Sequence, residues 1–282
     1  EYRRQRQMCI RDRDRPVTEQ YWYFLVNAFK GDLGDSFIFG EPALKLIIQR
    51  MPATLELALF SLFISLVIAI PLGIYAGYKP ESKTSKIIMG GSILGFSMPT
   101  FWVGIIFIMI FAVHFGWLPS TGRGEIGTFL GINSSLFTLN GLSHVFLPAL
   151  NLALFKISSV IRLTRAGTRE IILQDYITFA RSKGLSEKRI VLVHILKNIL
   201  IPIVTVVGLE FGSLIAFSTV TETVFAWPGM GKLIIDSIYN LDRPVIVAYL
   251  MIIVTFFVFL NLIVDILYTF LDPRVRIKGD SQ

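Results

Sequence analysis

Residues that build most catalytic and redox sites are scarce in this chain. It has one cysteine, Cys9, and three histidines that lie far apart, His114, His144 and His194. A single cysteine excludes an internal disulfide and a cysteine-based metal cluster, and scattered histidines give little support for a metal site. The sequence also lacks a GxxxxGK[ST] phosphate-binding loop, since the nearest match, at 229–232, has no upstream glycine at the required spacing. If ATP drives this protein, another chain must bind the nucleotide.

Charged residues are scarce as well. They make up 17% of the 282 residues, whereas 53% are hydrophobic and the mean hydropathy is +0.64; soluble domains have about 25% charged residues. The apolar residues form blocks that reach the roughly 20 residues needed to cross a bilayer as a helix. The net charge of +7 would suggest nucleic acid as a partner of a soluble protein. Here Lys and Arg gather in loops between apolar blocks, which is typical of membrane topology, so the sequence predicts an all-α, polytopic membrane bundle that binds no nucleic acid.

Five apolar blocks are predicted to span the membrane. The second is interrupted near Ser97-Met98-Pro99, because proline and the residue before it disfavour a continuous helix. The predicted spans are 55–78, 87–115, 144–161, 199–220 and 245–270. Residues 16–54 are expected to form an external segment leading into the bundle, residues 55–276 the transmembrane domain, and residues 277–282 a tail.

The orientation of the bundle follows from Lys and Arg, which favour cytoplasmic loops. Segments 79–86 and 162–198 and the C-terminal end are rich in these residues, whereas 116–143 and 221–244 hold few. With five spans, the C-terminus lies inside and the N-terminus outside, which leaves the arginine-rich residues 1–15 outside, against the rule. We expect that a first span is missing and that residues 1–15 are disordered and foreign to the protein; the alternative is a genuine translocated tail.

The cytoplasmic segment 162–198 is long for a passive connection. Its apolar residues recur at helical spacing, Gly184 suits a left-handed helix cap, and Ser186 suits the N-cap of a following helix. These features predict a short helix, a glycine break and a second helix that leads into the fourth span. Tyr176, Ala180 and Gly184 fall on one face, where the two small residues would let another protein approach the backbone closely. The alternative is a solvated loop whose charges only fix the topology.

Two charges, Lys156 and Glu210, lie deep in the third and fourth spans. Each is about twelve residues from the external end of its span, so at about 1.5 Å per residue both lie roughly 18 Å below that surface. A charge at mid-membrane costs about 2.5–3.5 kcal/mol on insertion scales, so such groups pair or face water. We expect an ion pair or a shared lining of a translocation path; for Lys156, the alternative is that its amine reaches back to the cytoplasm.

Two motifs resemble chemistry that we do not expect. Residues 122–127 match GxGxxG, but a dinucleotide site needs a strand before it and a helix after it, and this match falls in an external loop. An intramembrane serine protease would need a serine and a histidine at one depth, whereas Ser213 lies mid-span and His194 is cytoplasmic. A secondary transporter or channel that uses Lys156 and Glu210 is the stronger alternative class.

The stretch Asp175–Ser186 (DYITFARSKGLS), followed by His194, Asn198 and Pro202, resembles the EAA loop of binding-protein-dependent ABC importer permeases. It is most similar to the first-permease type of the dipeptide, oligopeptide and nickel family, although the E-A-A triplet reads Thr178-Phe179-Ala180 and the spacing from Gly184 to Pro202 is longer than in the generic motif. Further segments match in order and spacing over about residues 20–276: Gly31–Ser36, Pro52–Leu57, Ser97–Trp102, Glu222–Gly231 and Asp272–Arg274.

This resemblance implies the fold of a type I ABC importer permease, with six spans in the family and a cytoplasmic N-terminus. It implies a non-catalytic subunit of a bacterial or archaeal cell membrane that binds no cofactor. The implied partners are a sister permease, two ATPase subunits and an external solute-binding protein; peptides are the first candidates for the solute, with nickel and other small solutes after them. The residues implied to couple the chain to the ATPase are Asp175, Tyr176, Ala180, Lys183 and Gly184.

The external loops are candidates for docking the solute-binding protein. The residues concerned are Trp117, Trp227 and Gly229. For each tryptophan the alternative is anchoring at the membrane interface, where aromatic side chains are enriched.

Overall fold

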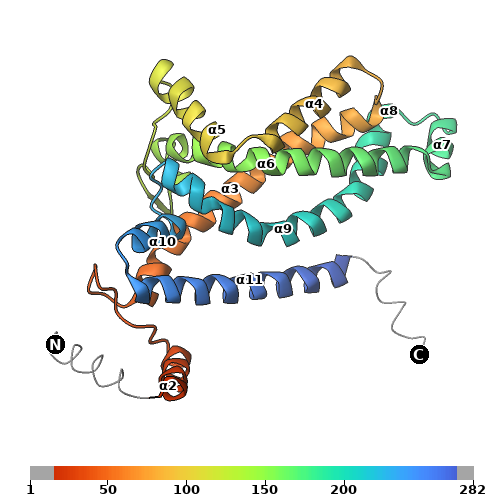
Figure 1. Ribbon diagram of the computed structural model, residues 1–282. Helices are drawn as coiled ribbons and strands as arrows, with labels where there is room; N and C mark the ends of the chain where they lie inside the picture. Colours follow the sequence, from red (N-terminus) through yellow and green to blue (C-terminus); the bar gives the residue numbers. More distant parts are fainter. Residues whose placement is uncertain (1–15, 272–282) are drawn as a thin grey trace, which may run out of the picture.

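Helices make up almost the whole of the structure, and the long ones run side by side (Figure 1). The computed structural model describes residues 16–271, apart from the side chains at positions 209, 265 and 267–271. The predictions for residues 1–15, for the tail 277–282 and for Asp272–Arg274 lie outside the described residues.

The elements follow one another in this order: α2 (Val17–Phe29), α3 (Ala43–Tyr78), α4 (Lys83–Ser97), α5 (Thr100–Phe107), the π-helical turn η1 (Ile108–His114), the antiparallel hairpin β1 (Gly127–Phe129) and β2 (Ile132–Ser134), the 3-10 turn η2 (Ser135–Phe137), α6 (Leu139–Ile172), α7 (Asp175–Ser182), α8 (Glu187–Arg189), the π-helical turn η3 (Ile190–Ile195), α9 (Leu196–Val224), α10 (Met230–Tyr239) and α11 (Arg243–Leu271).

Among the described residues, four helices are long and apolar enough to cross a membrane, and a fifth span results if α4 and α5 count as one. These two helices meet at an angle of 106° around residues 97–99, so the predicted interruption of the second span is confirmed. The first span starts earlier than predicted, because α3 begins at Ala43. Hydropathy did not predict this first part of α3, because its sequence mixes polar and apolar residues. The segment is held in the bundle because Ala43 and Ile47 are buried against α10 and α11.

The centre of the bundle is the pair α3 and α6, which approach each other closely through small residues. A Cβ atom on Gly73 would lie 2.5 Å from Cβ of Thr164, and one on Gly77 would lie 2.6 Å from Cβ of Thr168. Packing of this kind is typical of membrane helices, since small residues let two backbones come together. The pair therefore forms a stiff unit on which α4, α5 and α9 pack.

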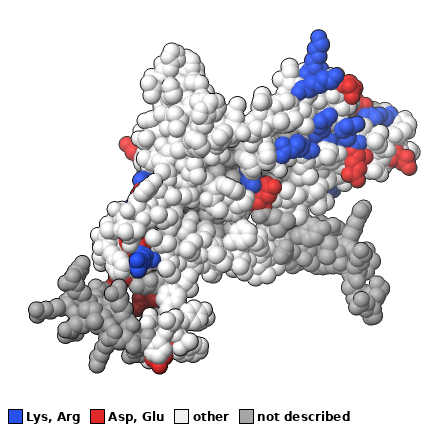
Figure 2. Space-filling model, in the orientation of Figure 1, with Lys and Arg blue, Asp and Glu red and all other residues white. Residues whose placement is uncertain are grey.

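Charge is distributed unevenly along the bundle. Lys and Arg gather at the end that carries α7 and α8, whereas the middle of the visible face is almost free of charge (Figures 1 and 2). This arrangement agrees with the cytoplasmic placement of that end by the positive-inside rule. The opposite end carries α10 and the loops between α5 and α6.

Candidate functional site

The short helix α7 stands at the basic end of the bundle and stops as the sequence predicted. Gly184 has a φ of +77°, a conformation that suits glycine because it lacks a Cβ atom. The amide of Leu185 donates to the carbonyl of Ala180 over 3.3 Å, and the amide of Gly184 donates to that of Arg181 over 2.9 Å. These two bonds are the Schellman pattern that closes a helix. A second helix then begins at Glu187 with Ser186 in the N-cap position, so the predicted helix–break–helix arrangement is confirmed.

The face of α7 that looks outward differs from the predicted one. Ile177 and Ala180 are buried against the bundle, so Ala180 is not available for close approach by another protein. Phe179 is 60% exposed instead, and the amine of Lys183 lies 4.5 Å from the centre of its ring. Ile177 and Ala180 are three residues apart and so lie on one face of the helix. This spacing was the feature of the sequence that could have predicted that Phe179 points outward.

The other residues predicted for coupling lie on or beside this outward face. Asp175 opens α7, where a carboxylate favours the positive end of the helix dipole. Tyr176, Lys183 and Gly184 are exposed, and a Cβ atom on Gly184 would meet no atom within 4 Å. Leu173, just before α7, is also exposed and was not among the residues predicted for coupling. Together these side chains form an exposed apolar surface with a basic residue beside it.

Polar bonds tie α7 to the spans. Glu187 accepts a hydrogen bond from Nε of Arg181 over 3.0 Å and from the hydroxyl of Tyr78 over 2.5 Å. Because Tyr78 is the last residue of α3, this carboxylate joins the end of α7 to the first span. Asn198 in α9 donates to the hydroxyl of Tyr176 over 3.2 Å. The carboxylate of Glu187 also raises the pKa of Arg181 above its ordinary value through their hydrogen bond, so this arginine stays charged.

Lys156 and Glu210 form an ion pair inside the bundle, as predicted from their depth. Nζ of Lys156 lies 2.9 Å from Oε2 of Glu210 and donates to Oγ of Ser213 over 3.0 Å. The side chain of Lys156 is 6% exposed, whereas that of Glu210 is 34% exposed. The amine therefore turns toward α9, and the alternative in which it reaches back to the cytoplasm is wrong. A partly open carboxylate at this depth fits the lining of a path for polar solutes.

Two residues predicted to dock a binding protein are buried. The indole of Trp227 donates to the carbonyl of Ala53 over 2.9 Å and has no exposed surface. Gly229 lies so close to Glu222 that a Cβ atom would come within 2.4 Å of its carboxyl carbon. Both residues serve the packing of α9 and α10 on α3, so the structure corrects their predicted contact with an external protein. Trp117 is exposed and stacks on Phe115 with ring centres 4.5 Å apart, so for Trp117 docking stays a prediction.

Two buried carboxylates at the external end escaped the sequence reasoning. Glu222 accepts from the hydroxyl of Thr54 over 2.8 Å and from the amide of Lys232 over 3.0 Å, which satisfies the start of α10. Glu56 accepts from Arg123, and from the amide of Ser135 over 3.1 Å, which ties the long external loop to α3. A carboxylate among apolar residues was the feature of the sequence that could have predicted each of them. Their hydrogen-bond partners could be identified only from the fold.

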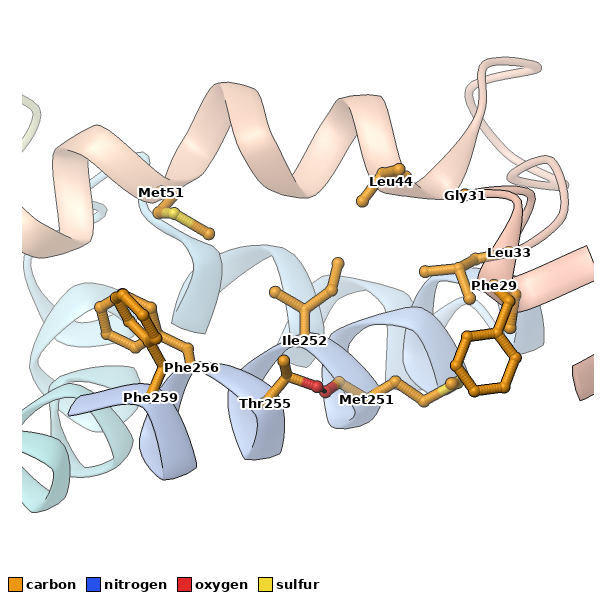
Figure 3. A pocket seen from close by; sticks show the side chains of 11 residues that line it. Phe29, Gly31, Leu33, Leu44, Met51, Met251, Ile252, Thr255, Phe256 and Phe259 are labelled. Carbon is orange, nitrogen blue, oxygen red and sulfur yellow. Dashed lines mark hydrogen bonds between the residues drawn. The ribbon is translucent and has the colours of Figure 1, made fainter. Parts of the chain in front are cut away.

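An apolar hollow of about 500 Å³ lies between the end of α2, the start of α3 and the outer side of α11 (Figure 3). Its only polar side chain, Thr255, donates to the carbonyl of Met251, so the hollow offers no chemistry. Within residues 16–271, no group of three or more His, Cys, Asp or Glu side chains is placed to hold a metal.

The chain is similar to known membrane transport proteins along most of its length. Residues 69–277 match the model of the family described as binding-protein-dependent transport system inner membrane component. The dipeptide transport system permease protein DppB of Escherichia coli (strain K12) is 34% identical over 280 residues, which cover 94% of this chain and 83% of that protein. The oligopeptide transport system permease protein AppB of Bacillus subtilis (strain 168) is 40% identical over 262 residues, 93% of this chain and 81% of that protein.

Solved structures agree on the fold. The inward-facing MetNI methionine ABC transporter superposes with a TM-score of 0.65 at 17% identity, covering 81% of this chain and 97% of that one. A chain of an amino acid ABC transporter crystallised with histidines superposes with a TM-score of 0.53 at 16% identity, covering 79% of this chain and 93% of that one. The predicted type I permease fold is therefore confirmed.

Proposed function

Because the chain belongs to the family of binding-protein-dependent transport inner membrane components, and is thus the non-catalytic permease subunit of an ATP-driven importer, we propose that it carries peptides. The support is that relatives with 34–40% identity over most of the chain are named as dipeptide, di/tripeptide and oligopeptide permeases. Membership of the family implies ATPase and binding-protein partners. We add that the pathway is completed by a sister permease and that the complex works in a bacterial or archaeal cell membrane.

The proposed coupling element is the exposed face of α7. Phe179, with Leu173 and Tyr176 near it, would enter a groove on an ATPase subunit, while Lys183 and Asp175 contribute charge at its rim. The observation that carries this assignment is that α7 exposes Phe179 at the basic end of the bundle while Ile177 and Ala180 fix the helix to the spans. Closure of the ATPase pair on ATP would move α7, and the spans would rock between inward-open and outward-open states.

The proposed path for the solute follows the face of α9 that exposes Glu210. The carboxylate of Glu210 is paired with the amine of Lys156, which also donates to the hydroxyl of Ser213. A peptide carries an ammonium group, and a partly exposed carboxylate in the path lowers the cost of removing that group from water. The chain itself would need no cofactor for this role, since nucleotide is bound by the partner subunits.

The test is reconstitution of the complete complex, with its ATPase and binding-protein partners, in vesicles with a labelled dipeptide. We expect uptake that requires ATP on the ATPase side and the binding protein on the other, and ATP hydrolysis that rises when the loaded binding protein is present. Uptake driven by an ion gradient with no ATPase subunits would overturn the proposal in favour of a secondary transporter. Uptake of another solute class with ATP would overturn only the peptide assignment.

A further inference from the structure

The break between α4 and α5 lies inside the second predicted span, where backbone groups cannot normally be left without partners. Met98 has extended dihedrals (φ −85°, ψ 138°) between two helices that meet at 106°. Irregular backbone at membrane depth is tolerated where it is buried in protein or lines water. Met98 and the neighbouring Phe96 are both exposed, so burial does not explain the break. Within this chain the break therefore lies on an open side of the bundle, which fits a side that borders water.

Glu210 is a second and independent sign of water. Its side chain is 34% exposed although the residue lies in the middle of α9. An ionised carboxylate that faced lipid to this extent would be costly, and such groups in membrane proteins face a bundle interior or a water-filled cavity. The exposed part of Glu210 therefore borders the same kind of space as the break at Met98.

A row of aromatic rings connects these two places. The ring of Phe96, next to the break, stacks on Phe155 with centres 4.5 Å apart, and Phe155 lies 6.3 Å from Phe217 in α9. Phe155 precedes Lys156, whose amine lies 5.8 Å from the centre of its ring. The break, the aromatic row and the ion pair thus form one continuous surface, built from α4, α6 and α9.

This surface combines exposed aromatic rings with a carboxylate. Phe217 is 61% exposed and Phe96 is 45% exposed, so both rings are accessible to a ligand at this surface. Next to them stands a carboxylate whose Oε2 atom already binds Lys156, which leaves lone pairs on Glu210 for a further donor. A ligand that fits has a cationic donor close to an apolar or aromatic side chain.

We propose that Phe96, Phe155, Phe217 and Glu210 form a subsite in the path that receives one residue of a passing peptide. The peptide's ammonium donates to Glu210, and its neighbouring side chain packs on the aromatic row, where aromatic pairs add to simple burial. Lys156 holds the carboxylate in place through their ion pair. This inference rests on the proposed function for its substrate, but the surface itself is accessible to probes that are not peptides.

The first experiment measures selectivity in the complete reconstituted complex. Phe217→Leu keeps the site apolar but removes the ring, so uptake of Phe-containing dipeptides should fall relative to Ala-Ala by about 2- to 12-fold, the range to which one aromatic pair corresponds. The matched control is Phe63→Leu in α3. Phe63 has the same exposed fraction, 61%, and an aromatic neighbour of its own, Phe60, and its replacement should leave the ratio unchanged. An unchanged ratio in Phe217→Leu would overturn the assignment of the aromatic row.

The second experiment needs no peptide. In a Cys9→Ser background, Phe217→Cys is labelled in the assembled complex with a cationic and an anionic methanethiosulfonate reagent. We expect faster labelling by the cation, and loss of that preference when Glu210→Gln is added. Absence of labelling, or equal rates for both reagents, would overturn the subsite. If labelling behaves as expected while the wild-type complex imports no peptide, the subsite stands and the peptide assignment fails.

Discussion

At the scale of single residues, the ion pair between Lys156 and Glu210 has the clearest energetic consequence. Each partner compensates a charge that bilayer and protein would otherwise disfavour. Lys156 is almost fully buried, so Glu210→Gln leaves its charge with neutral acceptors only, among them the hydroxyl of Ser213. Lys156→Met leaves a carboxylate that water can partly reach. Loss of Glu210 should therefore cost more stability than loss of Lys156.

A double-mutant cycle tests this pair. We expect Lys156→Met and Glu210→Gln each to lower the thermal stability of the purified complex, and the double variant to be less impaired than the sum by about 0.5–3 kcal/mol, the usual range for groups in contact. Stability is measured by thermal unfolding in one detergent, with assembly checked by size-exclusion chromatography. Strict additivity would remove the pairing, although Glu210 could still line the path.

Gly229 provides a residue-scale test of the buried carboxylate Glu222. A Cβ atom at Gly229 would lie 2.4 Å from the carboxyl carbon of Glu222, so Gly229→Ala forces a shift in a packed site. We expect a loss of about 1–3 kcal/mol, which is typical of overpacking. Gly90→Ala is the control, because a Cβ atom there meets no atom within 4 Å and alanine favours a helix over glycine. The measurement is thermal unfolding of both variants, and equal melting temperatures would contradict the packing seen here.

At the scale of elements, α7 is held between α3 and α9 by side chains rather than by the backbone alone. The carboxylate of Glu187 joins Arg181 at the end of α7 to Tyr78 at the end of α3. Both Arg181 and Glu187 are partly exposed, so the pair adds little to stability. If α7 is the coupling element, as we propose, the geometry of this pair would determine how a displacement of α7 is passed to the first span.

We therefore expect Glu187→Gln to impair coupling without impairing assembly. In the reconstituted complex, the number of ATP molecules hydrolysed per solute imported should rise, because closure of the ATPases moves α3 less. Glu170→Gln, an exposed glutamate on α6, is the matched control and should keep the wild-type ratio. A purely structural role would instead lower the yield of complex and leave the ratio as it was.

At the scale of the whole molecule, the cytoplasmic end has to recognise an ATPase subunit. Phe179 is a large apolar side chain exposed on α7, and buried aromatic anchors carry much of the affinity of protein interfaces. Phe179→Ala should weaken co-purification with the ATPase subunits by at least about 1 kcal/mol, roughly fivefold in affinity. Phe29→Ala, which removes an exposed ring beside the external end of α3, is the control. Equal recovery of ATPase with both variants would show that α7 docks through another face.

The sequence by itself predicted the spans, apart from the first part of α3, and their order, and it led to the prediction of their orientation. Spans are readable because backbone polar groups in lipid must be satisfied within each helix, which demands long apolar blocks, and because Lys and Arg mark the cytoplasmic loops. The break at 97–99 and the cap at Gly184 were readable for a similar reason, since proline and glycine act through their own backbone. Lys156 and Glu210 could be matched because rise per residue converts sequence position into depth.

Only the tertiary structure decided which side each of these residues faces. Trp227 and Gly229 sit in a loop that hydropathy places outside, yet Glu222 and Ala53 bury them. Ala180 turns inward and Phe179 outward, because rotation of a short helix is set by the bundle against which it packs. The joining of Phe96, Phe155 and Phe217 into one row likewise depends on helices that are distant in sequence. The depth of a residue in the membrane depends on its own helix, so the local sequence predicts it. The direction in which its side chain points depends on the neighbouring helices, so only the packing of the whole bundle decides it.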